Sequence, residues 1–286
     1  MQTVAECYKK VRKDCFKFIR SQEIKKDKFI NKAKMVKYFL IPICFWIAKK
    51  AKNRKPFIVG LSGGQGTGKT TISSIMSIIL KKYFKLNIFK ISIDDFYKTR
   101  KERISLSKRV HPMLLTRGVP GTHDINMMLS FFKQAKSKKF KRLKLPTFNK
   151  AIDDRFSKKY WYDLKNKPDV IIFEGWCVGA KYQKNADLKK NQNFIEKKYD
   201  NNLIWRKTLN RYLKNQYKKL FNKIDKLIYL KAPSFSHIFK WRFLQEQKLK
   251  LTSKSKRTMS KTQVKEFIMF YERITKHMMK NYSKIS

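Results

Sequence analysis

Acidic residues are scarce in this chain of 286 residues. Asp and Glu together number 20 against 70 Lys and Arg, which gives a formal net charge of +50. A charge of this size attracts nucleotides, acidic metabolites, nucleic acids and membrane surfaces alike, so it does not identify one partner. Lysine is also spread along the whole chain, and a general bias of composition explains the charge at least as well as a basic binding face.

Cysteine and long apolar runs are also few. The longest apolar stretch, YFLIPICFWIA at 38–48, is shorter than the ~20 residues of a membrane-spanning helix, and Pro42 interrupts it. The start of the chain lacks the pattern of a secretory signal. We therefore expect a soluble, cytoplasmic protein without a membrane span. We also expect reduced thiols, because no C-x-x-C pair and no His at metal-ligand spacing accompanies Cys7, Cys15, Cys44 and Cys177.

Short apolar runs of strand length alternate with segments of helical period. The runs are rich in Ile and Val, as strands buried on both faces should be, and lie at 56–62, 87–95, 169–176 and 226–232. Helical segments follow at 72–80, 209–224 and 264–278. This alternation predicts a three-layer α/β/α fold with a mostly parallel sheet, in which ligands collect at the carboxyl ends of the strands.

Two parts of the chain do not follow this alternation. Residues 1–55 are expected to form a basic helical extension packed on the core, so that 56–286 make up the main domain. Residues 97–168 contain loops punctuated by Pro and Gly, a helix near Ile125 to Phe132 and an extended segment at 141–149. We predict one elaborated α/β domain, with no linker or internal repeat.

Five of the nine glycines lie between residues 56 and 76. There, GGQGTGKT matches the phosphate-binding pattern G-x-x-x-x-G-K-[ST], after an expected strand and before an expected helix. Bare backbone lets amide groups close on phosphate oxygens, Lys69 can reach the β and γ phosphates, and the Thr70 hydroxyl can ligate Mg²⁺. A glycine-rich turn that only caps a helix is the alternative. The expected nucleotide-binding residues are Gly63, Gly64, Gln65, Gly66, Thr67, Gly68, Lys69, Thr70 and Thr71.

Three carboxylates are expected at the same edge of the sheet as this loop. Asp94 and Asp95 end the second apolar run and Glu174 ends the third. By strand alternation Asp94 shares a face with Lys90 and Ser92, which makes it the better catalytic candidate of the pair. Glu174 is a candidate for holding Mg²⁺. An ordinary strand-end turn or helix cap is the competing interpretation for each acid.

With these residues in place, the sequence resembles the phosphate-loop small-molecule kinases that include uridine kinase, pantothenate kinase and phosphoribulokinase. Within that group it is most similar to the bacterial and plant D-glycerate 3-kinase family. The resemblance spans about residues 56–280. It depends on GLSGGQGTGKTT, SIDDFY (92–97), RGVPGTHD (117–124), LPTFNKAIDDR (145–155), DVIIFEGWCVGA (169–180), WRKTLNRYL (205–213), WRFLQEQKL (241–249) and FIMFYERITKHM (267–278).

The resemblance implies roles for particular residues. Asp94 would orient or deprotonate the acceptor hydroxyl, Glu174 would hold Mg²⁺ through water, and a lid arginine, Arg242 or in reserve Arg257, would close on the phosphates. The implied substrate-pocket residues are Asp94, Arg117, His123, Asp124, Lys150, Asp154 and Arg155. The sequence has Asn149 where the family has an acid, and it stops at KNYSKIS where the family continues into a further strand.

The hypothesis from the sequence is an ATP- and Mg²⁺-dependent kinase that phosphorylates a hydroxyl of a small acidic metabolite, with D-glycerate favoured. Lys69, Asp94 and Arg242 are its expected catalytic residues. Another kinase of the uridine and pantothenate kinase group is one alternative. A nucleic-acid-stimulated ATPase is a second, although we find no further ATPase motif and expect no specific nucleic acid. A nucleotide-binding regulator without turnover is a third. The sequence does not predict the oligomeric state.

Overall fold

The computed structural model describes residues 3–24, 28–53, 56–252 and 258–282. Its central sheet has the strand order β2-β7-β1-β8, and every neighbouring pair is parallel. The strands are β1 (Phe57–Gly63), β2 (Ile88–Ser92), β7 (Val170–Gly175) and β8 (Lys226–Leu230). The four apolar runs of the sequence thus form the sheet, and the predicted three-layer α/β/α fold is confirmed.

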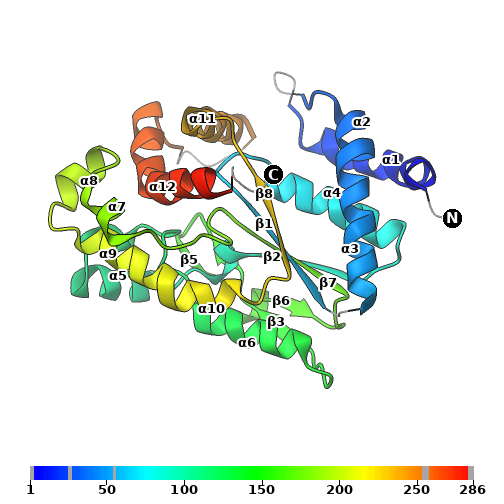
Figure 1. Ribbon diagram of the computed structural model, residues 1–286, viewed down its shortest axis with the longest axis horizontal. Coiled ribbons are helices and arrows are strands. Elements are labelled where there is room, and N and C mark those ends of the chain that lie inside the picture. Colours follow the sequence, from blue (N-terminus) through cyan, green and yellow to red (C-terminus); the bar gives the residue numbers. More distant parts are fainter. Residues whose placement is uncertain (1–2, 25–27, 54–55, 253–257, 283–286) are drawn as a thin grey trace.

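One face of the sheet is covered by the N-terminal helices together with the helix that follows the glycine-rich loop (Figure 1). These are α1 (Val4–Ser21), α3 (Ile41–Asn53) and α4 (Lys69–Lys82). Side chains alternate along β1, so Phe57, Val59 and Leu61 lie in this apolar cluster whereas Ile58 lies in the cluster of the opposite face. The central strands β1 and β7 are therefore buried on both sides, as their Val- and Ile-rich sequences predict, whereas the edge strands β2 and β8 are partly exposed.

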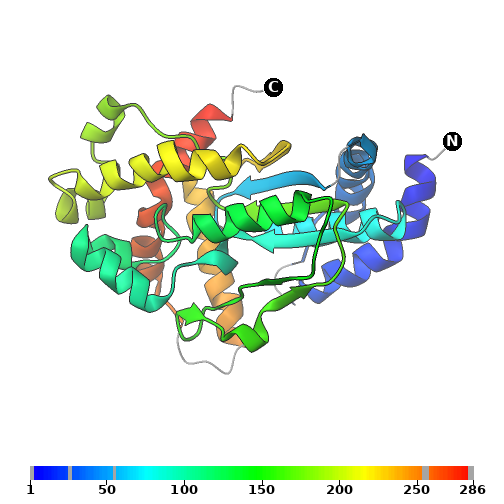
Figure 2. The same cartoon turned by 90° about the horizontal axis from the view of Figure 1, so that it is seen from below.

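The opposite face packs on helices from the middle and the end of the chain. In α6 (Ile125–Lys136), Phe131 meets Phe89 of β2 with ring centroids 5.7 Å apart, and Figure 2 shows α6 running along the sheet. The segment with helical period at 209–224 forms α9 (Ile204–Tyr212), a π-helical turn η5 (Leu213–Tyr217) and α10 (Lys218–Phe221). The last helix is α12 (Lys261–Asn281).

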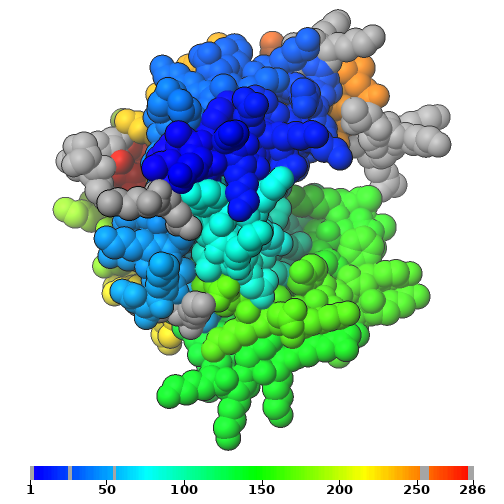
Figure 3. Space-filling view, turned by 90° about the vertical axis from the view of Figure 1, so that its right-hand side faces the viewer, coloured from blue at the N-terminus to red at the C-terminus, as the bar shows by residue number. Residues whose placement is uncertain are grey.

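The N-terminal segment forms helices that share one apolar cluster with the sheet. A short α2 (Lys32–Lys34) leads into a π-helical turn η1 (Met35–Leu40) and then into α3. Pro42 is the second residue of α3, so the π-helical turn lies directly before it. A prolyl ring disrupts an ordinary helical turn, and the wider π turn lies where that disruption falls. The Cys44 thiol lies 3.8 Å from the Met76 carbonyl of α4. Figure 3 views these helices at the surface, above α4 and the segment that follows it. A domain boundary at residue 55 stays a prediction.

Smaller elements complete the structure between the main strands and at its carboxyl-terminal end. No helix of the described ranges is long and apolar enough to cross a membrane. The cysteines are buried free thiols.

The remaining elements are η2 (Ile93–Phe96), α5 (Arg100–Arg109), η3 (Pro112–Leu115), β3 (Leu143–Leu145), β4 (Phe148–Asn149), β5 (Asp154–Arg155), η4 (Lys158–Tyr160), β6 (Tyr162–Leu164), α7 (Asn185–Lys189), α8 (Phe194–Tyr199) and α11 (Phe235–Thr252).

Candidate active site

The glycine-rich loop connects the end of β1 to the start of α4. Gly66 and Gly68 have φ angles of 81° and 83°, a left-handed backbone that side chains with a Cβ rarely adopt. The Lys69 ammonium donates to the carbonyls of Gly63 and Gly64, each at 2.8 Å. Since an ammonium has three donors, one remains for a ligand oxygen. The loop therefore has the geometry of a phosphate cradle with a cation fixed in it.

Burial changes the acid–base behaviour of Lys69. Desolvation lowers the pKa of its ammonium to about 8, although the nearby carboxylates of Asp94 and Glu174 favour the charged form. A bound phosphate would add negative charge and raise that pKa again. Lys69 is consequently a cation whose charge depends on what occupies the loop.

Helix α11 lies directly over the loop. A Cβ built on Gly66 would meet the Cβ of Trp241 at 2.5 Å, and one built on Gly64 would meet Ile238 at the same distance. Glycine is therefore required at Gly66 by contact with the backbone of α11 and by its own left-handed conformation, whereas a side chain at Gly64 would need Ile238 to move. This arrangement places the neighbouring Arg242 beside the phosphate loop.

A cleft of about 700 Å³ opens beside the loop, at the carboxyl ends of the strands. This is the position at which α/β folds bind ligands, and the volume suits a small molecule with part of a nucleotide. Its lining includes loop residues, three acids from strand ends and four cationic side chains besides Lys69. The lining residues include Gln65, Lys69, Thr70, Asp94, Asp95, Arg117, Lys150, Glu174 and Arg242.

Asp94 lies on the 3-10 turn η2 rather than on strand β2. The strand ends at Ser92, whose hydroxyl accepts a hydrogen bond from the Asp94 amide and starts the turn. The strand alternation used in the sequence argument therefore does not apply to this pair of acids. Both Asp94 and Asp95 nevertheless line the cleft, because the turn projects from the same edge of the sheet as the loop.

The two neighbouring acids have different electrostatic surroundings. Burial alone would raise the pKa of Asp94, but Lys150, whose Nζ lies 3.0 Å from Oδ2, and the Tyr97 hydroxyl together hold it below its ordinary value. Burial and the charge of Asp94 raise the pKa of Asp95 to about 6. Asp94 is thus the carboxylate that stays ionised and able to accept a proton.

Glu174 is the next-to-last residue of β7 and accepts hydrogen bonds from two hydroxyl groups of α4. Thr70 Oγ1 donates to one carboxylate oxygen and Ser73 Oγ to the other, each at 3.0 Å. The Thr70 oxygen keeps lone pairs for a cation, and Mg²⁺ typically takes few protein ligands together with phosphate and water oxygens. The donors present therefore fit Mg²⁺ at Thr70, with Glu174 beside it. Ser73 was not among the expected residues, although its spacing of three from Thr70 places both on one helix face.

Arg117 and Lys150 add positive charge to the lining of the cleft. The Arg117 guanidinium pairs with Asp153 and lies over the Phe148 ring, 5.6 Å from its centroid. The Tyr271 hydroxyl donates to the Arg117 carbonyl at 2.9 Å and fixes the backbone there. Arg117 is only 29% exposed, so it is a positioned cation rather than a surface one.

Four other expected substrate residues do not line the cleft. Arg155 donates to the Tyr97 carbonyl at 2.7 Å and pairs with Asp124 at 3.2 Å, while Asp124 also caps helix α6. Asp154 accepts from the amide of Arg100. His123 is buried, 2.6 Å from the Tyr217 hydroxyl, and burial lowers its pKa to about 4. These contacts hold the segment from Tyr97 to Arg100 on the side away from the cleft. They come from His123, Asp124, Asp154 and Arg155.

Arg242, the expected lid arginine, forms an ion pair within its own helix, α11. Arg242 donates to Glu246 at 2.6 Å, and its guanidinium lies 5.5 Å from the centroid of the Phe267 ring. Glu246 also accepts from the Met259 amide at 2.8 Å, which connects α11 to the segment that precedes α12. The reserve candidate, Arg257, lies outside the described residues.

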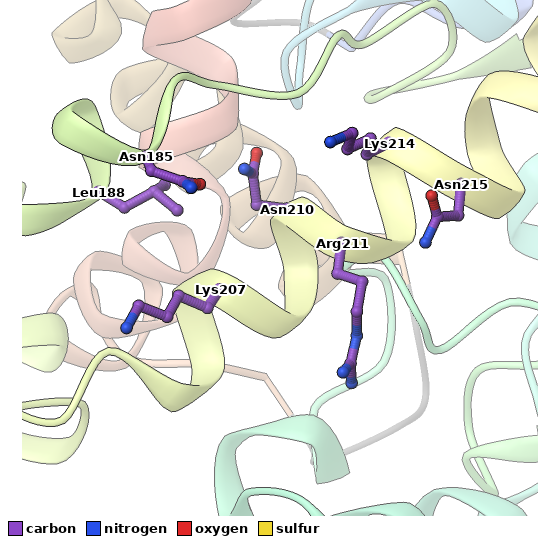
Figure 4. Close-up of a pocket in the computed structure, with 7 residues that line it drawn as sticks. All are labelled: Asn185, Leu188, Lys207, Asn210, Arg211, Lys214 and Asn215. Carbon is purple, nitrogen blue, oxygen red and sulfur yellow. The ribbon is translucent and has the colours of Figure 1, made fainter.

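A second hollow of about 260 Å³ lies beside α9 and η5 and shares no residue with the cleft. Figure 4 shows Asn210 and Lys214 on one side of the helix and Arg211 and Asn215 on the other, so these side chains do not converge on one point. The Asn210 amide is already bonded to the Gln183 backbone at 2.7 and 3.0 Å. We assign no ligand to this hollow.

Comparison with known proteins bears on the family of the chain. No family model matches the sequence. The uncharacterized kinase mug58 of Schizosaccharomyces pombe is 31% identical over 225 residues, which cover 76% of this chain and 79% of that protein. The chain belongs to the P-loop small-molecule kinases, the family that includes D-glycerate 3-kinase.

Two further relatives of this kinase have D-glycerate 3-kinase in their names. The chloroplastic D-glycerate 3-kinase of Arabidopsis thaliana is 28% identical over 260 residues, covering 84% of this chain but 54% of that protein, about half its length. The solved structure of D-glycerate 3-kinase from Cryptococcus neoformans superposes with a TM-score of 0.70 at 24% identity, over 83% of this kinase and 87% of that chain. At that identity the structural likeness shows the shared fold.

Proposed function

We propose that this kinase transfers the γ-phosphoryl group of ATP to a hydroxyl of D-glycerate and yields 3-phosphoglycerate and ADP. The single observation that most supports this is the ionised Asp94 in the same cleft as the phosphate loop and two positioned cations. The Arabidopsis relative is a D-glycerate 3-kinase by name, which favours this acceptor over others. Residues 56–286 would form the kinase domain, with 1–55 as its helical extension.

The nucleotide side of the reaction depends on the glycine-rich loop. Its amides and the start of α4 would bind the phosphates of ATP, and Lys69 would give its free donor to a phosphate oxygen. Thr70 would hold Mg²⁺ with Glu174 beside it, and the ion would neutralise phosphate charge when bound. Arg242 would stabilise the negative charge that develops as the bond from Pγ to the ADP oxygen breaks.

The acceptor side depends on Asp94. Its carboxylate would accept the proton of the acceptor hydroxyl while that oxygen forms its bond to Pγ. Because Lys150 keeps the pKa of Asp94 low, the acid acts mainly by orienting the hydroxyl and receives the proton late in the transfer. Tyr97 would keep the carboxylate directed into the cleft.

A small anionic acceptor fits the charge of the cleft. Arg117 and Lys150 both line it, and a guanidinium can bind a carboxylate with two parallel hydrogen bonds. An uncharged acceptor such as glycerol would offer these two cations no negative charge, whereas a hydroxy acid adds a carboxylate to the pairs that they already form with Asp153 and Asp94. We therefore expect selection for hydroxy acids over polyols and nucleosides.

The test is ADP release by the purified full chain with Mg²⁺, ATP and one acceptor at a time: D-glycerate, glycerol, uridine or pantothenate. Turnover with D-glycerate, and a product phosphorylated at its 3-oxygen by ³¹P NMR, is the expected result. Turnover with uridine or pantothenate alone would move the protein to another acceptor within its family. Hydrolysis stimulated by RNA but by none of these acceptors would support the nucleic-acid-dependent ATPase instead.

A further inference from the structure

The outer face of the N-terminal helix pair η1–α3 is apolar although it faces solvent. Tyr38 is 61% exposed, Phe39 57% and Trp46 38%, and Pro42 between them is exposed too. Tyr38, Pro42 and Trp46 follow one another at intervals of four, which places them on one side of a helix. We refer to Tyr38, Phe39, Pro42 and Trp46 as the outer stripe.

The opposite face of the same helices is already used for packing. Val36, Leu40, Cys44 and Ile47 are almost fully buried in the cluster that covers the sheet. A surface helix normally needs one apolar stripe, with polar side chains on the other side. Packing on the core therefore accounts for the inner face and for the inner edge of Trp46, whose ring lies 5.9 Å from that of Phe57, but it gives no reason for the exposed rings of Tyr38 and Phe39.

Positive charge flanks the outer stripe at both ends. Lys34 precedes it, Lys49 and Lys50 follow it, and all three are exposed. Residues 28–53 contain no Asp or Glu. Exposed aromatic side chains between lysines are typical of helices that lie in the interface of an anionic membrane, where Trp and Tyr sit at the level of the headgroups and lysines meet the phosphates.

We propose that the outer stripe is a docking surface for an anionic phospholipid bilayer, which it enters from the side without spanning. Tyr38, Phe39 and Trp46 insert among the headgroups, and Lys34 with Lys49 and Lys50 binds lipid phosphate. Tyr38, Phe39 and Pro42 are exposed and Trp46 is exposed on its outer edge, so docking leaves the fold unchanged. The kinase would then work at a membrane surface, whatever its acceptor.

A second copy of the chain fits the outer stripe less well. A symmetric interface would bring the same lysines of two copies together, at a net charge of +50 per chain. Stable protein interfaces also bury about 800 Å² on each partner, which is more than four side chains along three helical turns supply. Lipid headgroups offer the opposite charge and require no such area.

The experiment is co-sedimentation of the full chain with vesicles of phosphatidylcholine, with and without phosphatidylserine. We expect binding to the mixed vesicles, and a loss of about tenfold in the double variant Tyr38→Ser/Phe39→Ser, which removes apolar area from the stripe. The matched control is Tyr160→Ser/Phe194→Ser, because those rings are 60% and 55% exposed elsewhere on the surface. Equal binding by both double variants would overturn the proposal.

A second pair of variants distinguishes docking through the outer stripe from general attraction of the net positive charge to anionic lipid. Lys34→Glu/Lys49→Glu/Lys50→Glu should lose most binding, whereas the same change of charge at Lys108, Lys138 and Lys139 should lose little. This pair keeps the outer stripe intact, so it also decides the question if the Ser variants fold poorly. Failure of the wild-type chain to bind mixed vesicles, or a dimer in solution that Tyr38→Ser/Phe39→Ser dissociates, would refute membrane docking in favour of no partner or of a second copy.

Discussion

The Lys150 ammonium lies 3.0 Å from the Asp94 carboxylate, and both residues line the cleft that the phosphate loop also lines. Lys150 comes from the loop between β4 and β5, far along the chain from the turn that bears Asp94. The pair keeps the candidate catalytic carboxylate ionised, and the 62% exposure of Lys150 leaves its charge accessible to an acidic acceptor. Removal of either partner should therefore have a distinct kinetic signature.

Asp94→Asn removes the proton acceptor but keeps the shape of the side chain. We expect kcat to fall by about 10²- to 10⁴-fold with little change in thermal stability. Steady-state kinetics with D-glycerate, alongside circular dichroism to confirm folding, measures this. An Asn variant with nearly wild-type kcat would remove Asp94 from the mechanism.

Lys150→Met should shift a pH profile as well as weaken acceptor binding. Lys150 lowers the pKa of Asp94, so its loss raises that pKa and moves the acidic limb of kcat/KM for the acceptor to higher pH. KM for D-glycerate should rise while KM for ATP changes little. An unmoved acidic limb would mean that the ion pair does not control the ionisation of Asp94.

The buried Lys69 predicts a limit to activity at alkaline pH. Its pKa of about 8 is depressed, so the free enzyme loses the ammonium charge as the pH rises through that value. We expect kcat/KM for ATP to fall above about pH 8, and kcat at saturating ATP to fall only at higher pH, because bound phosphates raise the pKa. If kcat/KM for ATP and kcat at saturating ATP fell at the same alkaline pH, bound phosphate would not raise the pKa of Lys69 and this prediction would be wrong. Lys69→Ala, folded but nearly inactive, is the control.

Ser73 should act through Glu174 rather than on the substrates. Ser73→Ala removes one of the two hydroxyl groups that orient the carboxylate, so the Mg²⁺ concentration for half-maximal rate should rise by about tenfold. KM for the acceptor should stay the same. Ser77→Ala provides the control, since Ser77 is a buried serine one turn further along α4. An equal effect from both serines would indicate general damage to the helix.

Two glycines of the loop should respond differently to the same substitution. Gly66→Ala combines a left-handed backbone with a 2.5 Å contact to Trp241, whereas Gly68→Ala has the same backbone cost and open space around its Cβ. Both should lose about 1–3 kcal/mol of stability from backbone strain, and Gly66→Ala should lose more and displace α11. Thermal melts rank the stability of the two variants, and nucleotide affinity tests whether displacement of α11 disturbs the phosphate loop. A greater loss in Gly68→Ala would contradict the packing described here.

The strands and the phosphate loop could be predicted because their signals are local. Continuous runs such as 169–176 fit only a strand buried on both faces, and the spacing from Gly63 to Thr70 specifies a backbone shape directly. The parallel pairing then follows from the alternation of strands and helices, whereas the order β2-β7-β1-β8 was not predicted, because the crossover rules leave several orders open. The lengths of α6 and α12 agree with the apolar periodicity for the same reason.

The details of the acceptor side could not be predicted in the same way. A serine that caps a short turn ends β2 at Ser92, and the apolar Ile93 conceals that boundary in the sequence. Which arginine faces a cleft depends on its partner: Arg117 pairs with Asp153 at the lining, whereas Arg155 turns away to Asp124. Such pairings join residues more than thirty positions apart, so spacing does not reveal them. The roles of the four residues behind Tyr97 stay predictions.

The shared cluster beneath the sheet also ties the first fifty residues to turnover. Helix α3 packs on β1 and on α4, and α1 packs on α4, in one apolar cluster with side chains of β1 and β7, the strands whose carboxyl ends carry Gly63 and Glu174. A deletion that begins the chain at Phe57 would leave α4 alone on that face, expose the side chains that α1 and α3 now cover, and loosen the strand tips themselves. Searches for altered catalytic rate should therefore sample the amino-terminal helices as well as the pocket, because their fit sets how firmly the reacting groups are held.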